Sequence, residues 1–148
     1  MGLILDSTLF ISGERTKLTV PGILEGLQEE FGDVMLAASI MTAWELLHGV
    51  WRASNPAVRV RRREFVEEAL ERVPFHPFGL TAARIAAEVD AHLRGQGKPI
   101  ATADLMIGST ALQLDYTLVT ANLRHFKRIP SLEVVKFDFG KNWLQKGG

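Results

Sequence analysis

The sequence predicts a three-layer α/β/α sandwich around a central, mainly parallel sheet of four to five strands. Short, nearly continuous apolar runs are typical of strands that are buried on both faces. The segments between them repeat apolar residues at intervals of three and four, as helices do. Crossovers between parallel strands place such helices on the faces of the sheet. The 148 residues contain no internal repeat or linker, so we expect one domain over residues 1–148.

Four segments have the composition of strands. They are Gly2–Leu5, Val34–Ala38, Thr117–Thr120 and Leu132–Phe137. Val73–His76 is either a further short strand or a turn between two helices.

Helical spacing marks the segments between the strands. Apolar residues recur at three- and four-residue intervals in Leu24–Phe31, Trp44–Trp51, Phe65–Leu70 and Leu105–Asp115. Residues 53–97 are mostly helical in character, with an interruption before Pro77.

The composition excludes several classes of protein. No cysteine is present, which rules out disulfides, thiolate zinc sites and a cysteine nucleophile. No apolar run approaches the ~20 residues that cross a bilayer, and the first residues do not resemble a signal peptide, so we expect a cytoplasmic protein without a membrane partner. The formal net charge is zero, so any binding to nucleic acid must depend on local basic patches.

Three acidic residues follow strands or begin helices on what would be one edge of the sheet. Asp6 follows the first strand in L-I-L-D-S-T, and Glu45 lies in the first turn expected for the helix after the second strand. Asp104 lies in the first turn of the helix that precedes the last two strands. Ligands of parallel α/β sheets bind at the carboxyl ends of the strands, so we expect these acids to converge there.

Each acid also has a simple structural interpretation. Thr42 and Glu45 match the spacing of a capping box. Asp104 suits the positive end of a helix dipole, and Asp6 suits an N-cap. The trio favours a functional reading, because carboxylates held together repel unless a cation lies between them. Oxygen-only ligands favour Mg²⁺ or Mn²⁺ over zinc.

Four sequence blocks together are similar to the signature blocks of PIN-domain ribonucleases, and most of all to VapC-like toxins of bacterial toxin–antitoxin pairs. The blocks are L-I-L-D-S-T-L-F-I, T-A-W-E-L-L-H-G, A-T-A-D-L-M-I-G-S-T-A and T-L-V-T-A-N-L-R-H-F-K-R-I-P. They occur in the family's order and spacing and extend from Leu3 to about Phe137. The resemblance implies a PIN-like fold and a metal-dependent endoribonuclease that acts as a toxin.

The resemblance also implies roles for individual residues. Asp6, Glu45 and Asp104 stand where the family has its metal-binding acids, and Ser7 matches the small hydroxyl residue that supports the first of them. In the family, the last of the four blocks often contributes a fourth acid, which follows the threonine that corresponds to Thr120. Asn122 stands there instead. We expect it to assist catalysis as an amide.

The other residues expected near the substrate are basic or lie in the same block. His125 occupies another position that is often acidic in the family. Arg124, with its basic neighbours Lys127 and Arg128, is expected to contact the RNA backbone. The second basic run, Arg59 to Arg63, is interpreted as a solvated helix face with acidic partners one turn away.

The expected partners follow from the resemblance. A toxin implies a cognate VapB-like antitoxin, and family members commonly form homodimers, for which Trp44, Trp51 and Phe78 are candidate contacts. Trp44 and Trp51 are otherwise interpreted as part of the core. The alternative function is a weakened PIN-like module that binds antitoxin or RNA without cleavage, and Asn122 is the residue that keeps this alternative open. A structure-specific DNA nuclease is disfavoured because the chain has no insertion to clamp a flap.

Overall fold

A five-stranded parallel sheet forms the centre of the computed structural model, which describes residues 1–123 and 125–140. The strands are β1 (Gly2–Leu5), β2 (Met35–Ser39), β3 (Phe75–His76), β4 (Thr117–Thr120) and β5 (Val134–Lys136). Their order across the sheet is β3-β2-β1-β4-β5, and every neighbouring pair is parallel. The predicted fold class is confirmed.

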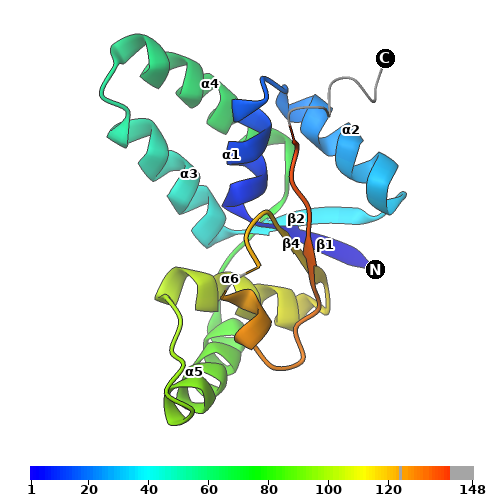
Figure 1. Cartoon of the computed structure of the whole chain (residues 1–148), viewed down its shortest axis with the longest axis vertical. Helices are drawn as coiled ribbons and strands as arrows, with labels where there is room; N and C mark the ends of the chain where they lie inside the picture. The colour runs from blue at the N-terminus through cyan, green and yellow to red at the C-terminus, as the bar shows by residue number, and fades with distance from the viewer. Residues whose placement is uncertain (124, 141–148) are drawn as a thin grey trace.

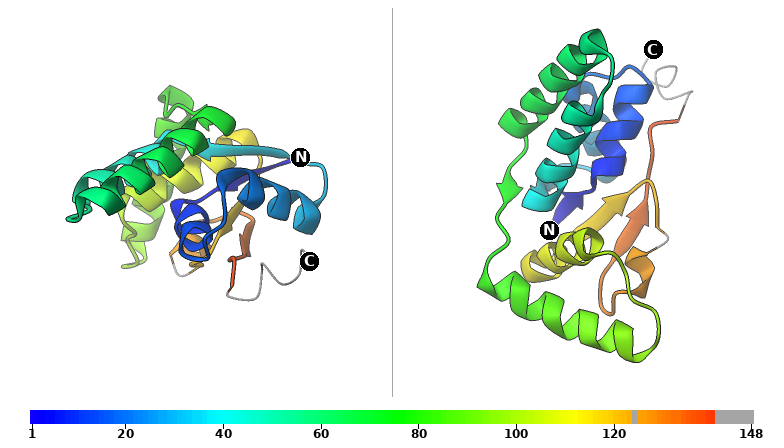
Figure 2. Two further views of the ribbon diagram at one scale, coloured as in Figure 1. Left: turned by 90° about the horizontal axis from the view of Figure 1, so that it is seen from above. Right: turned by 90° about the vertical axis from the view of Figure 1, so that its left-hand side faces the viewer.

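Helices cover both faces of this sheet. They are α1 (Ser7–Arg15), α2 (Val20–Phe31), α3 (Ile40–Arg52), α4 (Pro56–Arg72), α5 (Leu80–Gly95) and α6 (Thr102–Leu114). The sheet separates α1 to α4 from α5 and α6, as Figures 1 and 2 show. None of the described helices is long and apolar enough to span a membrane.

Alternation of side chains along the strands divides the core into two clusters. Leu3 and Leu5 of β1 pack with Leu9 and Phe10 of α1 on one face of the sheet. Ile4, between them in sequence, packs on the other face against α5 and α6. This alternation follows from the two-residue period of a strand, and it explains why G-L-I-L is apolar throughout.

Two features of the fold differ from the prediction or refine it. Helix α1 was not predicted, because Thr8, Ile11 and Gly13 have lower helix propensity than straight-chain residues. Packing overrides that preference: a Cβ atom built on Gly13 would lie 2.3 Å from Cδ1 of Ile23, so glycine allows α2 to approach closely. Residues Phe75–His76 form a strand that pairs with β2, which settles the open choice between strand and turn.

Candidate metal-binding and active site

Asp6 lies where β1 ends and α1 begins. It occupies the N-cap position of α1 but makes no capping hydrogen bond, and it is only 4% exposed. Its Oδ2 atom accepts hydrogen bonds from the hydroxyl groups of Thr8 and Thr120, each at 2.8 Å. Burial raises the pKa of Asp6, and these two hydroxyl groups partly oppose that shift by stabilising the carboxylate. The carboxylate is therefore fixed through one of its oxygens.

The two threonines belong to a small network at the end of β4. Their Oγ1 atoms are 3.2 Å apart. The backbone N–H of Ala121 donates to Thr8 Oγ1 at 2.9 Å, and that of Asn122 donates to Thr120 Oγ1 at 3.0 Å. Thr120 was predicted as a site residue, whereas Thr8 was missed. The only sequence signal for Thr8 is a hydroxyl group two positions after Asp6.

Glu45 lies in the second turn of α3, not in the first as predicted. Helix α3 begins at Ile40, and its cap is Ser39, whose Oγ accepts from the backbone N–H of Met41 at 3.1 Å. The capping-box interpretation of Thr42 and Glu45 is therefore wrong, because β2 extends to Ser39 and the helix starts before Thr42. Ser7 Oγ donates to Glu45 Oε1 at 3.3 Å instead.

The electrostatic environment of Glu45 disfavours its charge. Burial is the largest cause and the negative charge of Asp6 comes next, so that the pKa of Glu45 rises from 4.5 to about 7. The charge of Asp104 adds to this rise, and the hydrogen bond from Ser7 opposes it. Glu45 is thus coupled to both of the other acids.

Asp104 lies in the first turn of α6, as predicted. A helix that connects parallel strands runs back across the sheet, so its N-terminus lies at the carboxyl edge, beside Asp6. Burial and the charge of Asp6 raise the pKa of Asp104, whereas His125 lowers it. His125 is half-buried, and its Nδ1 atom has no hydrogen-bond partner among the described residues.

The three acids gather at one edge of the sheet. Asp6 raises the pKa of both Glu45 and Asp104, which shows that the charges lie close enough to repel. Among residues 1–123 and 125–140, no three acidic or histidine side chains already meet at a single ion position. The donors are nevertheless the oxygen ligands that Mg²⁺ and Mn²⁺ prefer, and a cation would relieve their repulsion. The chemistry of this donor set therefore suits a divalent ion.

The remaining predicted residues follow β4. Asn122 is exposed, and its backbone N–H donates a hydrogen bond to Thr120 Oγ1. Its role as an assisting amide stays a prediction. Arg124 lies outside the described residues. Lys127 and Arg128 are exposed in the 3-10 turn Phe126–Arg128, where Nη1 of Arg128 donates to the carbonyl of Pro99 at 3.3 Å.

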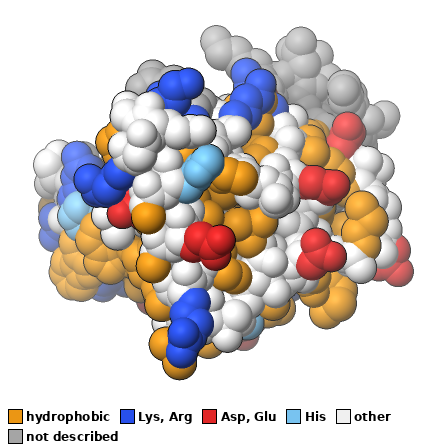
Figure 3. Space-filling model, turned by 90° about the horizontal axis from the view of Figure 1, so that it is seen from below, with side chains coloured by type: hydrophobic (Ala, Val, Ile, Leu, Met, Phe, Trp, Pro, Cys, Tyr) orange, Lys and Arg blue, Asp and Glu red, His pale blue; other side chains and the backbone are white. Residues whose placement is uncertain are grey.

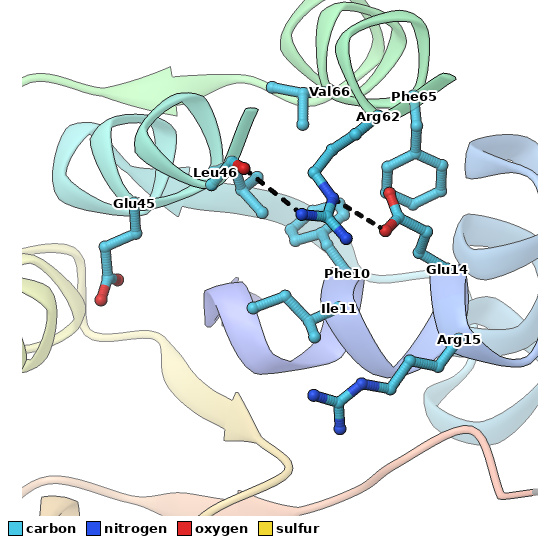
Figure 4. A pocket seen from close by; sticks show the side chains of 10 residues that line it. Phe10, Ile11, Glu14, Arg15, Glu45, Leu46, Arg62, Phe65 and Val66 are labelled. Carbon is cyan, nitrogen blue, oxygen red and sulfur yellow. Dashed lines mark hydrogen bonds and ion pairs between the residues drawn. The ribbon is translucent and has the colours of Figure 1, made fainter. Parts of the chain in front are cut away.

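A hollow of about 210 Å³ opens beside Glu45, between α1, α3 and α4. Its middle is apolar, with Phe10, Ile11 and Leu46 among the lining residues. Figure 4 shows Arg62 crossing this hollow from α4. Its Nε lies 3.2 Å from Glu14 Oε1, and its Nη1 donates to the carbonyl of Gly49 at 3.3 Å, so one side chain ties α4 to α1 and α3.

The basic run Arg59 to Arg63 is the predicted solvated face only in part: Arg61 and Arg63 are exposed, whereas Arg59 and Arg62 are half-buried. Arg59, like Arg62, has a partner within the fold: its Nη2 donates to the carbonyl of Ala53 at 2.6 Å. The guanidinium carbon of Arg63 lies 5.0 Å from the ring centroid of Trp51. Trp51 is 65% exposed and Trp44 is 56% exposed, so their interpretation as core residues is wrong. Their role as contact residues stays a prediction.

Comparisons with known proteins agree with this architecture. The sequence model of the PIN domain matches residues 3–132. Ribonuclease VapC1 of Rickettsia felis is 33% identical over 135 residues, which cover 91% of this chain and 96% of that protein.

Two solved complexes share the fold. The VapBC complex of Salmonella typhimurium, solved bound to DNA, contains a chain that is 26% identical, with a TM-score of 0.76 over 92% of this chain and 98% of that one. The VapBC2 complex of Rickettsia felis, bound to a promoter DNA fragment, contains a chain with a TM-score of 0.80 over 93% of this chain and 100% of that one. That chain is 24% identical, so the likeness shows the fold alone. With a parallel sheet in this order, acids gathered at its carboxyl edge and a family match over most of its length, the chain belongs to the PIN domain family.

Proposed function

We propose that this chain is a Mg²⁺- or Mn²⁺-dependent endoribonuclease that acts as a VapC-type toxin. The observation that carries the proposal is the convergence of Asp6, Glu45 and Asp104 at the carboxyl edge of the sheet, where burial and mutual repulsion raise their pKa values. The similarity of this chain to VapC1 of Rickettsia felis, which is named a ribonuclease, supports RNA as the substrate class.

Asp6 and Asp104 are the residues that we expect to bind the ion directly. Thr8 and Thr120 hold Oδ2 of Asp6, which leaves its Oδ1 free of these two bonds. A bound divalent cation would polarise a phosphoryl oxygen and lower the pKa of a bound water.

Glu45 is suited to accept the proton of the attacking water. A general base works best when its pKa is close to the working pH, and in the metal-free protein burial and the charge of Asp6 raise the pKa of Glu45 to about 7. Ser7 orients this carboxylate through its hydroxyl group. Water then displaces the 3′ oxygen of the cleaved bond, and the products carry a 5′ phosphate and a 3′ hydroxyl group.

RNA cleavage with and without chelator tests this assignment. We expect the wild type to cut single-stranded RNA only with Mg²⁺ or Mn²⁺, and Asp6→Asn and Asp104→Asn to lose the activity. Glu133→Gln is the matched control, because its carboxylate accepts from Thr117 at the opposite end of β4. Undiminished cleavage by Asp6→Asn would remove the assignment. Binding of RNA without any cleavage by the wild type would favour the non-cleaving module.

The relatives also guide the proposal on partners. The solved relatives are VapBC toxin–antitoxin complexes, and we propose a cognate antitoxin for this chain on that basis. We propose a homodimer that uses Trp44 and Trp51, because large exposed apolar side chains that cluster on a surface mark interaction sites. Size-exclusion chromatography of the chain alone tests the homodimer, and the same measurement after co-expression with a candidate VapB-like antitoxin tests the complex.

A further inference from the structure

Arg15 lies in the last turn of α1, and its side chain turns back towards the beginning of the helix. Long side chains of a helix lean towards its N-terminus. Figure 4 shows the guanidinium group of Arg15 lying below α1, near Ile11. The beginning of α1 is the junction that holds Asp6, so Arg15 is directed from the end of the helix towards the acidic edge.

Two hollows on either side of α1 share Arg15 as a lining residue. One is the hollow of about 210 Å³ that Glu45 also lines. The other, of about 540 Å³, is lined by Thr8 and Ala121 of the network around Asp6 and continues along α1 past Ser12. Arg15 therefore lines both the hollow that reaches Glu45 and the hollow that reaches Thr8, a hydroxyl partner of Asp6.

The charge of Arg15 is uncompensated in the described part of the chain. It is exposed, and among residues 1–123 and 125–140 it makes no hydrogen bond or ion pair. Arg62 is the other cation that lines the hollow beside Glu45, and it already forms an ion pair with Glu14 and a hydrogen bond to the carbonyl of Gly49. Asp138 lines the larger hollow but forms no ion pair with Arg15.

We propose that Arg15 binds a backbone phosphate of the RNA strand next to the cleavage site. This inference rests on the proposed function. The acidic cluster repels a polyanion, and on the face in Figure 3 the Lys and Arg side chains lie mostly near the margins, without one continuous basic patch. A guanidinium group in the hollow that Glu45 also lines offsets that repulsion, and its planar fork matches two phosphate oxygens.

The salt dependence of RNA binding tests the contact without depending on cleavage. The assay uses the full chain with Asp6→Asn to prevent cleavage, Mg²⁺, and a fluorescent unstructured RNA followed by anisotropy across a sodium chloride series. Arg15→Met is compared with Arg84→Met, a matched control on α5, whose Arg84 is exposed and makes no ion pair in the described part of the chain. Arg15→Lys keeps the charge.

We expect Arg15→Met to weaken binding by at least about tenfold, as the loss of a charged hydrogen-bonding partner does. The slope of log K against log salt should decrease in magnitude by about 0.7, the value for one phosphate contact on a single strand. Arg84→Met should leave both unchanged, and Arg15→Lys should retain the slope. Asp138→Asn should strengthen binding, because it removes an acid from the same hollow.

Equal slopes for Arg15→Met and Arg84→Met would overturn the role of Arg15 and leave the nuclease proposal intact. Failure of the parent protein to bind RNA at any salt concentration would overturn both. Circular dichroism of Arg15→Met should match that of its parent, because the exposed side chain makes no fold-stabilising contact in the described residues.

Discussion

Replacement of Thr120 by valine should weaken metal binding with little change of shape. Thr120 is fully buried, and valine has nearly the same volume. The change removes the hydroxyl that donates to Asp6 Oδ2 at 2.8 Å and accepts from the backbone N–H of Asn122 at 3.0 Å. Asp6 then keeps only Thr8 as a hydroxyl partner.

The magnitude follows from the charge on the acceptor. A hydrogen bond to a charged group contributes about 1.5–3 kcal/mol, and loss of a group that orients a metal ligand costs about 10- to 100-fold in metal affinity or activity. We therefore expect Thr120→Val to bind Mn²⁺ about 10- to 100-fold more weakly than the wild type and to cleave RNA correspondingly more slowly. The backbone N–H of Asn122 loses this acceptor, and a typical hydrogen bond contributes about 0.5–1.5 kcal/mol, so the free energy of unfolding should fall by an amount of that order.

Isothermal titration with Mn²⁺, together with urea unfolding, separates the two effects. Thr117→Val is the matched control, because Thr117 lies on the same strand and its hydroxyl donates to the Glu133 carboxylate at 3.2 Å, at the other end of β4. It should leave Mn²⁺ affinity unchanged. If Thr120→Val bound Mn²⁺ as tightly as Thr117→Val, the claim that this network prepares Asp6 for a metal would be refuted.

Three further changes test the charge and packing around the site. Glu45→Gln should stabilise the metal-free protein against urea at pH 8 but not at pH 4.5. The fold disfavours the charged form of Glu45, so the free energy of unfolding of the wild type falls as pH rises from 4.5 to about 7, and glutamine avoids this loss. For this half-exposed group we expect a gain on the order of 1 kcal/mol after solvent screening, and equal gains at both pH values would contradict the shifted pKa. Arg62→Met should cost roughly 1 kcal/mol, and a double-mutant cycle with Glu14→Gln should show coupling, whereas additive effects would mean that the pair contributes nothing. Gly13→Ala should lower the thermal midpoint because its Cβ would collide with Ile23, and an unchanged midpoint would show that Ile23 adapts freely.

The sheet could be predicted from the sequence because its signal is local. A strand buried on both faces is apolar at every position, as Gly2–Leu5 is, and the predicted bounds of the strands lie within about two residues of the observed ones. Helix α1 could not be predicted, because Thr8 and Gly13 lower its intrinsic propensity and its stability comes from contacts with β1 and α2.

The site, like the fold, has residues that could be predicted from the sequence and residues that could not. The three acids could be predicted because strand ends and helix starts fix where a side chain lies relative to the sheet. The start of α3 was misplaced, because Thr42 and Glu45 imitate a capping box while Ser39 provides the cap. Thr8 and Arg15 could not be predicted, since their importance depends on which side of α1 faces the end of β4 and the neighbouring hollows.

Titration of Mn²⁺ with simultaneous measurement of RNA cleavage tests the central claim most directly. Bound Mn²⁺ is followed by electron paramagnetic resonance in the same samples in which the cut RNA ends are quantified. If Asp6 and Asp104 bind the ion and Glu45 serves as the base, cleavage should rise in parallel with occupancy, and Asp104→Asn should lose both. Cleavage by chelator-treated wild type, or full activity of Asp104→Asn without bound Mn²⁺, would contradict the account.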